Sequence, residues 1–198
     1  MRATAGRAFL EIVPPTIDLL AGNKPASPEE IAAAADKLPE EVRAALDRFP
    51  SAERDEQGRV VGPGLTLHLT PHRLELEDRS LFAWCALDAL HFPVLLGRRA
   101  SIESPCRGTG DPVHIEVTPA GIETAESPFA VVSIVAARDL ASFRSVGCNN
   151  THFFSSPEAA SRWLEKHQEA SILSVEDAFR LGRLIAEGVL GISRGTAP

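Results

Sequence analysis

The sequence predicts an α+β fold in which a winged-helix-like helical unit (residues 1–73) precedes a catalytic-type domain (residues 74–198). The second domain is expected to hold a mixed or antiparallel sheet with flanking helices. Two capped helical patterns near the N-terminus, alternating apolar segments in the middle and an amphipathic C-terminal segment lead to this prediction. A chain of 198 residues, 44% hydrophobic and 24% charged, is long enough for one large or two small globular domains.

The N-terminal unit is predicted from helix caps and a turn. Ser27 is a natural N-cap, Pro28 occupies the first helical position and Glu30 completes a capping box. A second helix opens at Pro39 and carries an apolar face. Residues 57–58 then form a Gln-Gly turn between two extended runs, which is the layout of a small winged helix.

The next expected element is a helix within residues 80–97, "SLFAWCALDALHFPVLLG", that ends before Pro93. Asp78 or Ser80 would cap it, and Pro93 would stop it, because the residue before a proline disfavours the helical conformation. Almost every side chain in this run is apolar, so we expect the helix to be buried.

The remaining elements alternate between strand and helix patterns. Residues 100–119 alternate on both sides of a Gly/Pro/Asp turn, which predicts a hairpin, and residues 129–137 form an apolar strand. Residues 155–168 predict a helix with a serine cap, residues 170–175 a short strand, and residues 175–190 a final amphipathic helix.

Composition argues against nucleic-acid and membrane partners. The formal net charge is −7, no Lys/Arg block occurs, and acidic residues outnumber basic ones in the winged-helix-like unit. Phosphate contacts need a concentrated basic face. No apolar run approaches the ~20 residues of a membrane span, and no secretory signal pattern is present, so a cytoplasmic location is expected. The three cysteines are then expected to be free thiols.

Cys85 and Asp88 stand three residues apart in the apolar helix, on one face by helical spacing. An unpaired cysteine alone is usually a small core residue. A buried carboxyl is costly unless it is paired or protonated, and burial can raise its pKa by as much as ~3–5 units. Asp88 could therefore hold and deliver a proton near neutral pH, or it could be a structural carboxyl that ties down a loop. The local sequence leaves both open.

Cys148 follows a glycine in a predicted loop and precedes Asn149 and Asn150. His152, four residues later, suggests a zinc pair, but a structural zinc site needs four ligands and the usual short Cys-x-x-Cys pairing is missing. Cys106 lies in the predicted hairpin turn, where a packed thiol is a simpler interpretation than a metal ligand. No phosphate-binding loop or nucleophile elbow is present.

Two segments, "FAWCALDALHFPVLLGRRASIESPCRGTGDPV" and "GCNNTHFFSSPEAASRWLEKHQEASILSVEDAFRLG", closely resemble the bacterial organomercurial lyase family, also called alkylmercury lyase. The resemblance runs from about residue 64 to residue 182. It implies an active site of Cys85, Asp88 and Cys148, and a structural role for Cys106. The chain departs from better-known members at residues 149–151, where they have a second cysteine and a histidine.

The resemblance implies that R–Hg⁺ is split into a hydrocarbon RH and Hg(II). Two thiolates, from Cys85 and Cys148, would bind the soft metal together with Asp88 and make the carbon more carbanion-like. Asp88 would accept a thiol proton and return it to that carbon.

The organic group would lie against an apolar wall of Trp84, Phe82 and Phe153. No cofactor is expected, because mercury enters as substrate and leaves as product. The expected partners are organomercurial small molecules, small external thiols that release the ion, and mercuric reductase as the Hg(II) acceptor.

Two other functions remain open from the sequence. A non-enzymatic protein could use Cys85 and Cys148 to bind or carry a soft metal, because binding requires only the thiolates. A metal-responsive winged-helix regulator is the second alternative, and the acidic balance of the N-terminal unit argues against it.

Overall fold

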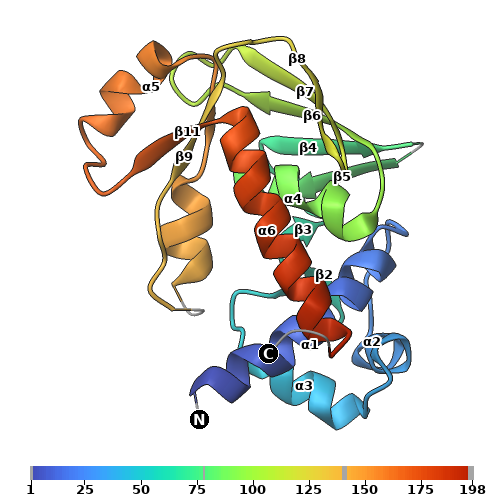
Figure 1. Cartoon of the computed structure of the whole chain (residues 1–198). Helices are drawn as coiled ribbons and strands as arrows, with labels where there is room; N and C mark the ends of the chain where they lie inside the picture. The colour runs from blue at the N-terminus through green and yellow to red at the C-terminus, as the bar shows by residue number, and fades with distance from the viewer. Residues whose placement is uncertain (1, 78, 140–141, 196–198) are drawn as a thin grey trace.

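The computed structural model describes residues 2–77, 79–139 and 142–195 and has the predicted α+β architecture (Figure 1). The strands form a two-stranded hairpin, a three-stranded sheet and a six-stranded sheet. Every pairing among the described strands is antiparallel. Of the two sheet types expected, mixed or antiparallel, the described part of the chain therefore has the antiparallel one.

The N-terminal unit contains the two predicted helices and the predicted turn. Helices α2 (Pro28–Ala35) and α3 (Pro39–Asp47) precede the hairpin of β1 (Glu53–Arg54) and β2 (Val60–Gly62). The capping box at the start of α2 is formed as expected, because the Ser27 hydroxyl accepts from the Glu30 amide and the Glu30 carboxylate accepts from the Ser27 amide.

A long first helix, α1 (Arg2–Leu20), was not predicted. Its sequence contains Pro14 and Pro15, which normally end or kink a helix because proline lacks an amide N–H. Tertiary packing overrides this local preference. Ile12 and Ile17 are each only 1% exposed, and α1 packs against α2, α3 and the C-terminal helix.

The basic groups of the N-terminal unit are largely neutralised by its own carboxylates. Arg43 pairs with Glu29, Arg54 with Asp47, and Lys37 with Glu11. These exposed pairs contribute little to stability, but they leave no concentrated positive face for phosphates.

Because of this charge pairing in the N-terminal unit, we expect no measurable affinity for duplex DNA at physiological salt in a gel-shift assay. Tight binding that weakens steeply with added salt would contradict this.

The six-stranded sheet has the strand order β3-β5-β4-β6-β7-β8. The predicted hairpin is confirmed by β6 and β7, whose Ala100↔Val117 and Pro105↔Pro112 pairs span it. In β7, Val113, Ile115 and Val117 alternate toward the core. The strands are β3 (Leu65–Thr66), β4 (His72–Leu76), β5 (Arg79–Ala83), β6 (Ala100–Pro105), β7 (Pro112–Thr118) and β8 (Gly121–Ala125).

The expected helix within residues 80–97 is wrong in its first third. Residues 79–83 form β5, and helix α4 (Ala86–Leu96) begins only after Cys85. Pairing of Leu81 with Leu74 of β4 supplies the backbone hydrogen bonds, and both side chains are fully buried, so sheet packing outweighs helix preference. Ser80 is therefore in a strand, and Asp78 lies outside the described residues. The predicted stop at Pro93 is also wrong, because Pro93 lies inside α4, which ends at Gly97 in the left-handed conformation (φ 63°).

The three-stranded sheet confirms the strands predicted within residues 129–137 and 170–175 and the helix between them, and it also contains a short strand at residues 153–154 that was not predicted. Strand β9 (Val131–Ile134) lies between β10 (Phe153–Phe154) and β11 (Ser171–Ser174). Helix α5 (Pro157–Leu164) starts at the predicted serine cap, whose hydroxyl accepts from the Ala159 amide.

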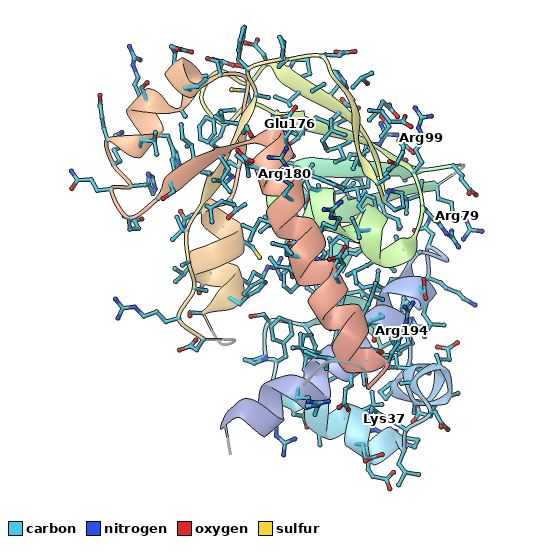
Figure 2. All side chains as sticks on the ribbon, viewed as in Figure 1. Lys37, Arg79, Arg99, Glu176, Arg180 and Arg194 are labelled. Carbon is cyan, nitrogen blue, oxygen red and sulfur yellow. The ribbon has the colours of Figure 1, made fainter. Side chains whose placement is uncertain are left out.

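The final helix, α6 (Val175–Ser193), crosses α4 and reaches α1, so it connects the sheet domain to the N-terminal unit (Figure 1). Figure 2 shows Glu176 and Arg180 near its start and Arg194 at its other end, on the side of the N-terminal unit that carries Lys37. A Cβ added at Gly182 would lie 3.0 Å from the Cβ of His91, so a larger residue here would crowd the crossing of α6 and α4. Among the described residues, no helix combines the length and apolar character needed to cross a bilayer.

Candidate active site

Cys85 is the N-cap of α4 rather than a residue inside the helix. Its backbone is extended (φ −150°, ψ 171°), and its Sγ accepts a hydrogen bond from the Asp88 amide at 3.4 Å. A cap and the third residue after it approach each other by this geometry, so the expected proximity to Asp88 arises from capping and not from a shared helix face. The amide donor also favours a thiolate at this position.

Asp88 lies in the first turn of α4 and is 5% exposed. Burial raises the pKa of its carboxyl from 3.8 to about 6, although hydrogen bonds from Cys85 and Cys148 and the charge of Arg144 lower it. The Nδ1 atom of His91 is 3.7 Å from Asp88 Oδ1. Burial lowers the pKa of His91 to about 4, so this imidazole is neutral at neutral pH and supplies no counter-charge.

Cys148 begins a short helical turn, η2 (Cys148–Asn150), which directly follows the π-helical segment η1 (Phe143–Gly147). The sequence predicted a loop here. Two contacts fix this turn: the Ala86 amide of α4 donates to the Thr151 carbonyl at 3.1 Å, and the Ser133 hydroxyl of β9 donates to the Asn150 carbonyl at 2.8 Å. The segment is therefore anchored to both the helix and the three-stranded sheet.

These contacts bring Cys85, Asp88 and Cys148 together, with their possible ligand atoms all within 4.8 Å of one another. The Cys148 Sγ donates to Asp88 Oδ2 at 3.7 Å. All three side chains are buried, and they are the only such group of three among the residues that the structure describes. His152 and Cys106 do not join this group.

Both thiols resist ionisation in this environment. Burial raises the pKa of Cys85 well above its ordinary value, and the Asp88 charge adds to the effect. For Cys148, the hydrogen bond with Cys85 lowers the pKa, but burial and the Asp88 charge outweigh it and the pKa is raised. Each cysteine therefore rests as a thiol and needs a proton acceptor when it binds a metal.

Arg144 lies close enough to the three-residue group to affect its charges, and the sequence did not reveal it. Its guanidinium lies 4.2 Å from the centroid of the Trp84 ring and forms a 2.6 Å ion pair with Glu53 of β1. Its charge helps to lower the pKa of Asp88 and of Cys148. Arg144 therefore links the N-terminal unit to the segment that carries Cys148, a long-range contact for which no local motif exists.

The three aromatic residues expected to contact the organic group lie in different surroundings. Trp84 lines a pocket of about 400 Å³ together with Cys148. Phe82 lines a neighbouring pocket, and Phe153 is completely buried in a T-shaped contact with the His72 ring. As substrate contacts, the three residues stay predictions.

Cys106 lies in the turn between β6 and β7 and is 1% exposed. Its Sγ accepts hydrogen bonds from the amide of Ser155 at 3.3 Å and from its hydroxyl at 3.5 Å. Burial raises its pKa, but hydrogen bonds from Thr109 and Ser155 outweigh burial and lower it to about 7. The thiol thus ties the hairpin turn to the start of the segment that leads into α5.

Replacing Cys106 with Ser should lower the free energy of unfolding by about 1–2 kcal/mol, within the usual range for one buried substitution. The smaller hydroxyl fills less volume and sits farther from its donors. Some catalytic activity should survive, because Cys106 is outside the three-residue group. Urea unfolding and initial rates would test this, and complete inactivity of the folded variant would contradict it.

Comparison with known proteins gives matches over nearly the whole chain. The family model described as alkylmercury lyase matches residues 65–187, and the model described as the helix-turn-helix domain of alkylmercury lyase matches residues 3–64. The two matches therefore meet between residues 64 and 65, whereas the division predicted between residues 73 and 74 falls within β4. As a boundary between independently folding domains, the predicted division stays untested.

Individual relatives agree with the family models. The chain is 54% identical over 169 residues to an alkylmercury lyase of Staphylococcus epidermidis, covering 85% of this chain and 78% of that protein. It is 47% identical to an alkylmercury lyase of Streptomyces lividans, covering 89% and 82% of the two chains. A crystal structure of the mercury-bound form of MerB2 has a TM-score of 0.75 at 22% identity, covering 94% of this chain and 99% of the other, which shows a shared fold.

Proposed function

The chain belongs to the alkylmercury lyase family of enzymes, and we propose that it cleaves R–Hg⁺ by protonolysis, with Cys85, Cys148 and Asp88 as the reacting side chains. The observation that carries this proposal is the buried group in which two thiols and one carboxyl lie within 4.8 Å of one another. Thiolates are the protein ligands that soft metals prefer.

The first part of the proposed reaction is capture of the metal by two thiols. Both thiol sulfurs bond to mercury and lose their protons, that of Cys85 to solvent water and that of Cys148 to a nearby base. The Cys148 thiol already donates to Asp88 Oδ2, so the carboxylate is placed to receive that proton. With a pKa of about 6, Asp88 is mostly ionised at neutral pH but still accepts a proton readily.

The second part is cleavage of the carbon–mercury bond. Two thiolates donate electron density to the metal and increase the negative charge on the bonded carbon. The carboxylic acid of Asp88 then gives its proton to that carbon, and the electron pair of the carbon–mercury bond forms the new C–H bond. The products are RH and Hg(II) held by Cys85, Cys148 and Asp88, and the carboxylate is regenerated.

The partners of this reaction follow from its chemistry and remain proposals. Trp84 would contact the organic group, with Phe82 and Phe153 behind it, and the protein would need no resident cofactor. Small thiols would remove Hg(II), and mercuric reductase would receive it. The proposed location is the cytoplasm, where such thiols are abundant.

The decisive experiment mixes the protein with phenylmercury and excess dithiol and measures benzene by gas chromatography. Release of at least one equivalent of benzene per protein molecule supports the lyase mechanism. Tight binding of phenylmercury without benzene would support the soft-metal carrier instead, because binding needs only the two thiolates.

A further inference from the structure

The pocket beside Trp84 and Cys148 has a distinct electrostatic character. Its volume of about 400 Å³ falls in the ~300–1,000 Å³ range of small-molecule sites. Besides Cys148 it is lined by Asn149, His152, His72, Cys106 and Arg107, with prolines at its edge. None of these described lining residues carries a carboxylate.

Arg107 supplies the fixed positive charge of this pocket. Burial and the nearby charge of Arg107 together lower the pKa of His152 to about 4, and burial lowers the pKa of His72 to about 3, so both imidazoles are neutral. The thiolate fraction of Cys106 is stabilised by its own hydrogen-bond donors, Ser155 and Thr109. Among the described residues, Arg107 has no ion-pair partner, so its charge remains available.

The backbone around Arg107 is held rigidly. Its amide donates to the Phe153 carbonyl at 2.8 Å, and the Cys106 amide donates to the Asp111 carbonyl at 2.7 Å. A Cβ added at Gly108 would lie 2.0 Å from the Ala159 carbonyl oxygen, so this glycine lets the turn press against α5. Arg107 therefore lines the pocket from a fixed turn, and Cys148 lines the same pocket.

We propose that this pocket is the docking site for an anionic low-molecular-weight thiol, whose carboxylate pairs with Arg107 while its sulfur reaches the mercury bound at Cys148. The inference rests on the proposed function. The incoming thiolate bonds to Hg(II), the Cys148–mercury bond breaks, and Cys148 leaves as a thiolate that takes a proton from water. A second thiol then displaces Cys85 in the same way.

The test loads the protein directly with one equivalent of Hg(II) chloride, so that it does not depend on cleavage. Release of Hg(II) is then followed with 3-mercaptopropionate, which is anionic, and with 2-mercaptoethanol, which is neutral, each rate expressed per thiolate. The anionic thiol should act about two- to fivefold faster in the parent, the range of an exposed ion pair, and this advantage should shrink as salt rises.

Arg107→Gln should remove the advantage of the anionic thiol and leave the rate with 2-mercaptoethanol unchanged, which also reports that the variant is folded. Arg48→Gln removes one charge from an exposed position on the N-terminal unit and should behave as the parent. Equal rates for both thiols in the parent, or an undiminished advantage in Arg107→Gln, would overturn the inference. Benzene release, measured separately, decides the proposed function itself.

Discussion

Replacing Cys148 with Ser is expected to abolish turnover. A serine hydroxyl does not ionise near neutral pH and is a poor ligand for a soft metal, so mercury would be held by one thiolate only. The carbon would then lack the electron density that makes it a base, and Asp88 would lose the thiol that donates to it at 3.7 Å. Benzene release from phenylmercury should fall below detection. Cys85→Ser should have the same effect on turnover, while its hydroxyl, a preferred N-cap group, can still accept from the Asp88 amide at the start of α4.

The matched control is Cys106→Ser, which removes a third buried thiol outside the group and should retain activity. Binding of Hg(II) should separate the variants too, with tight binding lost in both active-site variants and retained in the control. Parent-like benzene release by Cys148→Ser would show that one thiolate is sufficient, and the two-thiolate mechanism would have to be abandoned.

Local patterns were enough to predict most elements, because caps and turns act over a few residues. The capping box of α2, the hairpin of β6 and β7, and the serine cap of α5 depend on neighbours in the chain, and all three are present. The errors occur where distant packing decides. Pro14 and Pro15 lie inside α1, and residues 79–83 form a strand because β4 pairs with them.

The same distinction applies to the site. The spacing of Cys85 and Asp88 and the resemblance to a family pointed to the group, although its local geometry is a cap. Arg144 could not have been predicted, because its partners Trp84 and Glu53 are far away in the sequence. The need for glycine at residue 64 was likewise not predictable from the sequence. Its φ is 131°, and an added Cβ would lie 2.8 Å from Phe92 and 3.8 Å from Asp88 Oδ1. Such close approaches appear only in the folded chain.

Asp88→Asn should separate mercury binding from cleavage. Asparagine keeps the shape of the side chain and an oxygen that can accept from Cys148, and both thiols remain. The group that carries the proton is lost, so protonolysis should slow by ~10²–10⁴-fold, the usual effect of removing a general acid or base. Titration with Hg(II) and single-turnover benzene release would measure the two effects separately.

The pH dependence gives a second test of the same residue. With a pKa of about 6, Asp88 loses its ability to accept the thiol proton as the pH falls below that value, so the parent's cleavage rate should drop on the acid side. The folded carboxyl binds its proton more tightly than the unfolded one, whose pKa is near 3.8. The parent's free energy of unfolding therefore decreases as the pH rises from about 4 to about 6 and stays lower above that range.

Asp88→Asn lacks this titration, so it should be at least as stable as the parent at pH 7, and its low activity cannot then be attributed to unfolding. The acid limb assigned to Asp88 should also be absent from its remaining cleavage rate. A variant that cleaves phenylmercury as fast as the parent would show that Asp88 is a structural carboxyl and that the proton comes from water or another group. Slow cleavage with Hg(II) still bound by Cys85 and Cys148, by contrast, supports the proton-carrying role, because a disrupted site would lose mercury binding as well.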